Sequence, residues 1–154
     1  MTGMIGKKAP EFSRTADDGS EIRLSDLLQE NVVVLFFYPR DNTPVCTTEA
    51  CEFRDTHSDF LDAGAVVIGI SGDSDSSHQN FARTHNLPYR LISDSDGSLR
   101  KSFRVPRTLG LLPGRVTYVI DREGTICHVF SSAFNGSRHV EEALQTVRRL
   151  QASG

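Results

Sequence analysis

The chain has 154 residues, a length typical of one domain, and carries 17 basic against 20 acidic side chains for a net charge of −3. Apolar residues make up 38% and charged residues 24%, which excludes an intrinsically disordered chain. Because charges of both signs are mixed along the sequence, nothing indicates a nucleic-acid partner. We therefore expect one folded domain over residues 1–154.

The sequence also predicts no membrane span and no secretion signal. Its longest apolar run, Val32 to Tyr38, is far shorter than the ~20 residues that cross a bilayer. The first ten residues include two lysines and no hydrophobic stretch of the signal-peptide kind. We expect a cytoplasmic protein or, if a transit peptide has been removed, a plastid protein.

Two apolar runs predict neighbouring strands. Val32–Phe37 and Ala65–Ile70 are continuous apolar stretches, typical of strands that are buried on both faces. The intervening Thr43–Asp62 has the length of a crossover helix. Strand, helix and strand in this order form a right-handed unit with parallel strands. A second helix over 74–86 and a short strand over Tyr89–Ile92 are expected to follow.

The last third of the chain has a different pattern. Val116–Ile120 and Thr125–Phe130 are interpreted as strands joined by a four-residue turn that ends in Gly124, which predicts an antiparallel hairpin. From Ser137 apolar residues recur at helical spacing, and Asn135–Ser137 is interpreted as the N-cap region of that helix. The element order predicts an α/β protein with a thioredoxin-like fold, in which helices flank a mixed central sheet.

The number and spacing of the cysteines limit the disulfide, redox and metal chemistry that the chain can perform. The three cysteines are Cys46, Cys51 and Cys127. An odd number without a secretion signal argues against a framework of structural disulfides and leaves room for one redox pair. No metal or cofactor is expected, because Cys-x4-Cys is not a zinc-binding spacing and the five histidines show no ligand spacing.

The chemistry is concentrated at the start of the first long helix. Thr43 followed by Pro44 predicts a helix start, with the threonine side chain accepting a backbone N–H as N-cap. Cys46 is then the third helical residue, where unpaired N–H groups and the helix dipole favour an anion. The dipole contributes only ~0.3–1 kcal/mol, too little to ionise an ordinary thiol at neutral pH. A cation is required, and Arg40 and Arg115 are the candidates.

Cys46 has a second interpretation as an inert core residue, because buried free cysteines are common. It belongs to an apolar stripe with spacings of three and four residues, formed by Cys46, Ala50, Phe53, His57 and Phe60. The helix-start position and the nearby Cys51 favour a reactive thiol instead. In an ideal helix the two cysteine α-carbons are about 8.7 Å apart, and a disulfide tolerates at most about 7 Å. If the two cysteines pair, the first turns of the helix must unwind.

The start of this helix resembles the active site of a peroxiredoxin. The family signature, Pro-x-x-x-Thr-x-x-Cys, occurs as Pro39, Thr43 and Cys46, and the cysteine five residues later is similar to the subgroup called PrxQ or bacterioferritin comigratory protein. The similarity extends over nearly the whole chain, including 114–121. Val45 departs from the pattern, since the subgroup usually has glycine there and a β-branched residue is stiffer.

The resemblance implies a thiol-specific peroxidase. Cys46 would attack hydrogen peroxide or an organic hydroperoxide and become a sulfenic acid, and Cys51 would condense with it to an intramolecular disulfide. Thr43 and Arg115 would bind the thiolate and the reacting oxygens, and Pro39 would shield the pocket. The implied partner is thioredoxin or a similar dithiol reductant, and the implied state is a monomer.

Two other functions could use the same cysteine pair. One is a protein thiol–disulfide oxidoreductase, although its Cys-x2-Cys motif is missing; the other is a redox sensor without turnover. Reduction of insulin would identify the first, and rapid turnover of peroxide would exclude the second. Cys127 and His57 are interpreted as packing residues.

Overall fold

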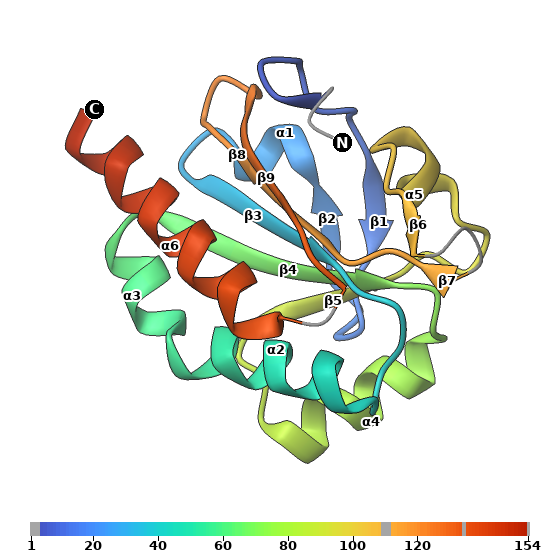
Figure 1. Ribbon diagram of the computed structural model, residues 1–154. Helices are drawn as coiled ribbons and strands as arrows, with labels where there is room; N and C mark the ends of the chain where they lie inside the picture. Colours follow the sequence, from blue (N-terminus) through green and yellow to red (C-terminus); the bar gives the residue numbers. More distant parts are fainter. Residues whose placement is uncertain (1–3, 109–111, 134, 154) are drawn as a thin grey trace.

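A five-stranded mixed sheet forms the centre of the computed structural model, which describes residues 4–108, 112–133 and 135–153 (Figure 1). The strands lie in the order β5 (Arg90–Ser93), β4 (Ala65–Ser71), β3 (Val32–Phe37), β8 (Val116–Ile120) and β9 (Ile126–Ser131). β3, β4 and β5 are parallel, whereas β8 is antiparallel to both β3 and β9. The predicted parallel strands and the predicted hairpin are confirmed.

The side chains of the central strand β3 supply two apolar cores. Successive residues of a strand point to opposite faces of the sheet. Val33, Leu35 and Phe37 therefore pack into the core on one face, and Val34 and Phe36 pack into the core on the other. Every residue of β3 is buried, which explains why this run is apolar throughout instead of alternating with polar residues.

Helices cover both faces of the sheet (Figure 1). The face of Val34 and Phe36 is covered by α2 (Pro44–Asp55), α3 (His57–Asp62), α4 (Asp75–His85) and α6 (Gly136–Ser153). The other face is covered by the hairpin of β1 (Ser13–Thr15) and β2 (Glu21–Arg23) with α1 (Leu24–Leu27) and α5 (Ser98–Ser102). A short pair, β6 (Arg107–Thr108) and β7 (Leu112–Pro113), completes the described elements. This arrangement confirms the predicted thioredoxin-like α/β fold. None of the described helices is long and apolar enough to cross a membrane.

The crossover between β3 and β4 consists of two helices, so the prediction of one helix over Thr43–Asp62 is wrong. α2 ends at Asp55 and α3 begins at His57, with Thr56 between them. Thr56 Oγ1 donates to the carbonyl of Glu52 over 2.7 Å. The Thr56 N–H also bonds to this carbonyl over 3.1 Å, and α2 ends at this residue, in line with the tendency of such side-chain bonds to bend and slightly destabilise helices.

The ends of α4 and the start of α6 follow the predictions. Ser74 Oγ accepts the backbone N–H of Ser77 over 3.2 Å at the start of α4, and Asn86 adopts a left-handed conformation at its end. Asn135 Oδ1 accepts the N–H of Arg138 over 3.1 Å, so Asn135 caps α6 as expected.

Candidate active site

Cys46 lies in the first turn of α2, as its third residue. Its side chain is 1% exposed and packs in the same core as Ala50 and Phe53, which confirms the predicted apolar stripe. His57, assigned to the same stripe, is half-buried on the separate helix α3. Burial alone would make Cys46 inert, but a charged donor reaches its sulfur.

Arg115 supplies this donor through a fork of three hydrogen bonds. Its Nη2 donates to Cys46 Sγ over 3.1 Å and its Nη1 donates to Glu49 Oε1 over 2.6 Å. Its Nε donates to the carbonyl of Ala133 over 3.1 Å. Only 4% of Arg115 is exposed, so solvent screens these charge interactions little. A guanidinium at this position stabilises a negative charge on the Cys46 sulfur.

The register of the sheet brings Arg115 to Cys46. β8 pairs with β3 so that Val116 lies opposite Phe37, and Arg115 therefore lies beside the segment that leads from β3 into α2. Arg40, the other cation suggested by the sequence, is exposed to solvent. Of the two candidates, Arg115 is the one that the fold places against the sulfur.

Glu49 is a site residue that the sequence analysis missed. It lies one turn after Cys46 on the same face of α2, is fully buried, and shares the Arg115 guanidinium with the sulfur. Its Oε2 has no hydrogen-bond partner among the described residues. Burial raises the pKa of Glu49 to about 8, although Arg115 acts to lower it. An acid three residues after the cysteine could have been recognised, because that spacing places both side chains on one helix face.

His139 closes the far side of Glu49. Its Nδ1 lies 3.6 Å from Glu49 Oε2 and 2.8 Å from the hydroxyl of Thr117, and its Nε2 lies 2.9 Å from the carbonyl of Ser132. Burial lowers the pKa of His139 to about 4 despite the bond to Ser132. The imidazole is therefore neutral near pH 7, with Nε2–H donating to the carbonyl and Nδ1 accepting from Thr117. Arg115 is the one charged partner of Glu49 among the described residues.

Thr43 and Pro39 lie near this site without touching the sulfur. Thr43 occupies the predicted N-cap position, but its side chain caps no N–H, and this part of the prediction is wrong. Its hydroxyl instead donates to the carbonyl of Arg40 over 3.0 Å. Pro39 is half-buried between β3 and α2. Within the described part of the chain neither side chain bonds to Cys46, so their predicted roles stay predictions.

Both other cysteines are free and half-buried. Cys51 lies on the uninterrupted helix α2 with Cys46, and its Sγ lies 3.8 Å from Nδ1 of His85. Cys127 Sγ donates to Asp121 Oδ2 over 3.3 Å. Burial raises the pKa of Cys127 to about 11, and Asp121 adds to the shift, so this thiol stays protonated at neutral pH.

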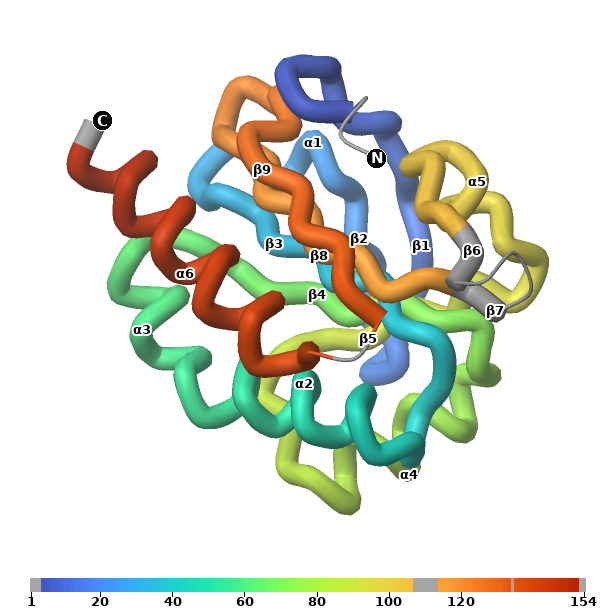
Figure 2. Tube along the Cα trace, viewed as in Figure 1, coloured from blue at the N-terminus to red at the C-terminus, as the bar shows by residue number. Residues whose placement is uncertain are grey.

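The start of α6 packs closely against the first half of α2, and Figure 2 shows the two traces side by side. A Cβ added to Gly136 would lie 3.0 Å from Glu49 Cβ and 3.1 Å from the carbonyl oxygen of Val45. A larger residue at this position would push the two helices apart by a few tenths of an ångström, so glycine allows this close approach. Beside it is an open pocket of about 220 Å³, lined by Pro44, Val45, Thr48, Asn135, Gly136 and Ser137.

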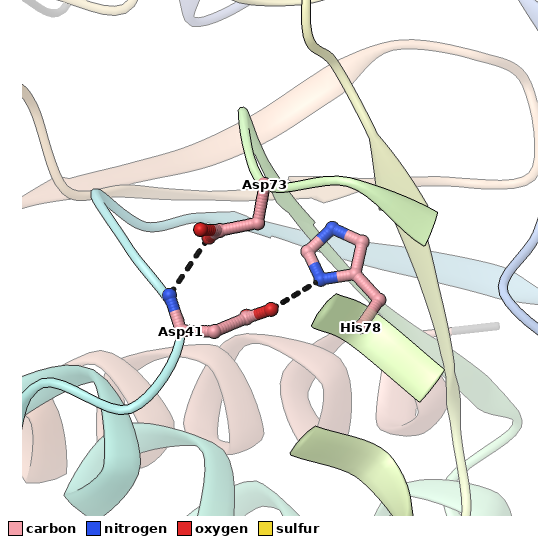
Figure 3. Close-up of side chains that lie close together, drawn as sticks. All are labelled: Asp41, Asp73 and His78. Carbon is pink, nitrogen blue, oxygen red and sulfur yellow. Dashed lines mark hydrogen bonds and ion pairs between the residues drawn. The ribbon is translucent and has the colours of Figure 1, made fainter. Parts of the chain in front are cut away.

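A second polar network holds the segment that leads into α2 (Figure 3). Asp41 is 4% exposed, and its carboxylate accepts hydrogen bonds from Tyr38 over 2.6 Å, Ser77 over 2.8 Å and His78 Nδ1 over 2.8 Å. The backbone N–H of Asp41 donates to Asp73 Oδ2 over 2.7 Å. The network therefore joins the segment after β3 to α4 and to the segment between β4 and α4.

This network also contains a group of potential metal ligands. One atom each of Asp41, Asp73 and His78 lies within 4.8 Å of the others. Protein groups already bond to these atoms, since Asp41 Oδ2 and His78 Nδ1 bond to each other and Asp73 Oδ2 accepts from Ser71 Oγ over 2.6 Å. We interpret the group as a structural network, because its hydrogen bonds are satisfied within the protein.

The charge state of the network makes folding stability depend on pH. Burial alone raises the pKa of Asp41, but hydrogen bonds from His78, Tyr38 and Ser77 outweigh it and lower the pKa overall. Burial lowers the pKa of His78, but Asp41 outweighs it and raises the pKa overall. Both His78 nitrogens then donate, Nδ1 to Asp41 and Nε2 to the carbonyl of Ile92 over 3.1 Å.

A His78→Gln variant is expected to lower the free energy of unfolding by about 1.5–3 kcal/mol near pH 5.5, as for other hydrogen bonds to charged groups. The charged His78 imidazolium contributes fully to the free energy of unfolding below the ordinary histidine pKa of ~6.5. This contribution is lost as the pH rises through the raised pKa of His78 in the folded state. The Asp41 carboxylate contributes to the free energy of unfolding above the ordinary aspartate pKa of ~3.9. This contribution is lost as the pH falls through the lowered pKa of Asp41 in the folded state. The difference between the wild type and the variant should shrink from pH 6 to pH 9. Urea unfolding at three pH values measures it, and a difference that grows with pH would contradict the assignment.

Comparisons with known sequences identify the family of this chain. Residues 5–129 match the AhpC/TSA family. Chloroplastic peroxiredoxin Q of Gentiana triflora is 45% identical over 91% of this chain and 64% of its own length. The chloroplastic peroxiredoxin Q of Suaeda salsa is 45% identical over 94% of this chain and 68% of its own length. The chain thus spans 64% and 68% of these two relatives, or about two thirds.

Solved structures are similar over nearly the whole chain. Peroxidoxin BcpB from Mycobacterium tuberculosis superposes with a TM-score of 0.88 at 39% identity, covering 96% of this chain and 97% of that one. A bacterioferritin comigratory protein of Xanthomonas campestris with alkyl peroxide reduction activity superposes with a TM-score of 0.82 at 27% identity, covering 91% and 92%. From the family match, these relatives and the Cys46–Arg115 geometry, we conclude that this chain belongs to the AhpC/TSA family and, within it, to the peroxiredoxin Q group.

Proposed function

We propose that this protein is a thiol-specific peroxidase that reduces hydrogen peroxide and organic hydroperoxides. The observation that carries the proposal is the 3.1 Å hydrogen bond from Arg115 Nη2 to Cys46 Sγ at a buried helix start. A donor placed there stabilises the thiolate and can also bind the oxygen that departs during the reaction. The alkyl peroxide reduction activity of the Xanthomonas campestris relative supports the substrate class.

In the first step Cys46 becomes a sulfenic acid. Its thiolate attacks the terminal oxygen of the hydroperoxide, the O–O bond breaks, and the leaving alkoxide or hydroxide takes up a proton. A lower thiol pKa increases the fraction of thiolate but also makes the thiolate a weaker nucleophile. Hydrogen-bond donors at the departing oxygen are therefore needed as well. Arg115 supplies them. Thr43 Oγ1 uses its hydrogen on the Arg40 carbonyl, which leaves its oxygen as an acceptor for the peroxide O–H, and Pro39 shields the pocket.

In the second step Cys51 condenses with the sulfenic acid to a disulfide within the chain. Both cysteines lie on the continuous helix α2, where their α-carbons are about 8.7 Å apart by helix geometry. Because a disulfide spans at most about 7 Å, the first turn of α2 must unwind before the bond closes. Val45, which precedes Cys46, stiffens this turn and slows unwinding relative to glycine.

When a Cys51→Ser variant receives one equivalent of peroxide per chain, it is expected to stop at the sulfenic acid of Cys46. Cys46 still reacts, but the remaining thiol, Cys127, bonds to Asp121 at the end of β8 opposite Arg115 and is not expected to reach the sulfenic acid. Mass spectrometry of the alkylated protein after peroxide treatment should find the Cys46–Cys51 link in the wild type and none in the variant. Cys127→Ser is the matched control and should retain the link; its loss there would assign resolution to Cys127.

The test of the proposed function is coupled turnover. Hydrogen peroxide and an alkyl hydroperoxide are supplied in excess with thioredoxin, thioredoxin reductase and NADPH, and NADPH oxidation is followed. Many turnovers per chain support a peroxidase. Consumption that stops after one equivalent would indicate a sensor, and insulin reduction without peroxide turnover would indicate a protein oxidoreductase.

We infer that the reductant is thioredoxin or a similar dithiol, because the oxidised product is a disulfide within one chain, which a dithiol reduces by thiol–disulfide exchange. The same intramolecular chemistry requires no second subunit, and we propose a monomer, which light scattering of the reduced protein tests. A cycle that depends on a dithiol reductant suits a reducing compartment, such as the cytoplasm or the plastid stroma. The plant relatives are chloroplastic, and localisation of a tagged chain in its own cells distinguishes the two.

A further inference from the structure

Cys51 has a basic partner on another element. Its Sγ lies 3.8 Å from Nδ1 of His85, the last residue of α4. Both side chains are half-buried. Neutral imidazole with its hydrogen on Nε2 presents a lone pair at Nδ1, and this lone pair can accept the thiol hydrogen of Cys51. The contact lies outside the Arg115 site and has no role in the first step.

The part of α2 that carries Cys51 is held by neighbouring elements. Arg54 Nη1 donates to the backbone carbonyl of His85 over 2.8 Å. Tyr89, just before β5, donates from its hydroxyl to the carbonyl of Ala50 over 2.7 Å. Tyr89 is 6% exposed and Ala50 is fully buried, so water cannot easily replace this bond. Cys51 therefore lies on a segment that is fixed to α4 and β5.

The first turn of α2 lacks polar end interactions, and its restraints are the packing of Gly136 on Val45 and the bond from Arg115 to Cys46. Thr43 provides no side-chain cap, and the turn contains no acidic residue to interact with the helix dipole. Oxidation of Cys46 to a neutral sulfenic acid also removes the negative charge that Arg115 attracts. We therefore expect the first turn to unwind while the segment that carries Cys51 stays folded, so that Cys46 moves to Cys51 and Cys51 remains beside His85.

We propose that His85 is a catalytic residue of the second step, in which its Nδ1 removes the thiol proton of Cys51 and releases the thiolate that attacks Cys46. This inference rests on the proposed peroxidase function. The Cys51 sulfur forms the S–S bond as the S–O bond of the sulfenic acid breaks, so Cys51 is oxidised and Cys46 is reduced. The leaving hydroxide takes up the proton that His85 received and becomes water.

The experiment measures the two steps separately in the full chain. One equivalent of peroxide is mixed rapidly with reduced protein, Cys46 oxidation is followed by trapping the sulfenic acid, and disulfide closure is followed by quenching and alkylation. In His85→Ala, Cys46 should oxidise at the wild-type rate. An ordinary thiol with a pKa of ~8.5 is only a few per cent ionised at pH 7, so closure should be about 10–30-fold slower than in the wild type.

The pH dependence separates a base from a structural role. Above pH 9 an ordinary thiol ionises without help, so the closure rate of His85→Ala should approach that of the wild type. His57→Ala is the matched control, because His57 is a half-buried histidine on α3 that packs on Tyr89 and makes no hydrogen bond to Cys46 or Cys51 among the described residues. It should close at the wild-type rate at every pH.

Three outcomes are distinguishable. Unchanged closure in His85→Ala at pH 7, or slowing that persists at high pH, would overturn the role of His85 as a base while leaving the peroxidase proposal intact. Failure of Cys46 to oxidise in the wild type would overturn the proposed function itself. As a second readout, Cys51 in a Cys46→Ser background should react with iodoacetamide about 10-fold more slowly at pH 7 when His85 is replaced. An unchanged alkylation rate would also count against the proposal.

Discussion

A Cys46→Ser variant is expected to lose peroxidase turnover completely. A serine hydroxyl is not ionised at any pH at which the protein is folded, and its oxygen cannot form the sulfenic acid that stores the oxidising equivalent. The substitution is close to isosteric, and the new hydroxyl can accept the Arg115 hydrogen bond, so the fold should persist. NADPH-coupled turnover of hydrogen peroxide measures the loss.

Cys127→Ser is the matched control for this variant. Cys127 is half-buried, and its thiol is held protonated by burial and by Asp121, with its pKa raised to about 11. Its replacement should leave the turnover rate unchanged. Normal turnover in Cys46→Ser would remove the central assignment, and loss of turnover in Cys127→Ser would show that the reactive cysteine has been misidentified.

An Arg115→Lys variant is expected to lower kcat/KM for peroxide by about 10²–10³, the typical effect of removing a donor to a developing oxyanion. Lysine keeps the charge but presents one ammonium in place of a planar fork. It cannot serve Cys46, Glu49 and the Ala133 carbonyl together, as the guanidinium does. Stopped-flow measurement of Cys46 oxidation isolates this step from disulfide closure.

Arg40→Lys serves as the control for Arg115→Lys. Arg40 lies closer to Cys46 in sequence, but its side chain is exposed. If the sheet register rather than sequence proximity determines which arginine acts on the sulfur, Cys46 should be oxidised at the wild-type rate in Arg40→Lys. An unaffected Arg115→Lys, or an equal loss in both variants, would exclude Arg115 from the step.

Local patterns were sufficient to predict the helix start and the position of Cys46 in its first turn. Thr43-Pro44 places Cys46 in the first turn of α2, and this depends only on the order of neighbouring residues. The choice between Arg40 and Arg115 could not be made in the same way. It depends on β8 pairing with β3, a contact between segments about 80 residues apart in the chain, and register is set by the packed sheet.

The residues that the sequence analysis missed also divide into those on one element and those brought together by packing between elements. Glu49 was accessible to sequence reasoning, because it lies one turn from Cys46 on the same helix. His139 was not, since it reaches Glu49 from α6. The network of Tyr38, Asp41 and His78 joins the end of β3 to α4, and no spacing rule relates those positions. Sequence patterns thus predict what one element contributes, and the packed sheet determines which elements meet.

The close contact at Gly136 affects how readily Cys46 would be oxidised beyond the sulfenic acid when peroxide is in excess. While the sulfenic acid waits for α2 to unwind, a second peroxide molecule can oxidise it further to a sulfinic acid, from which most proteins do not recover. Tight packing of Gly136 on Val45 and Glu49 favours the wound helix and lengthens that wait. In the proposed cycle, the one position on α6 that has no side chain therefore helps to set the dose of peroxide at which Cys46 is lost to further oxidation.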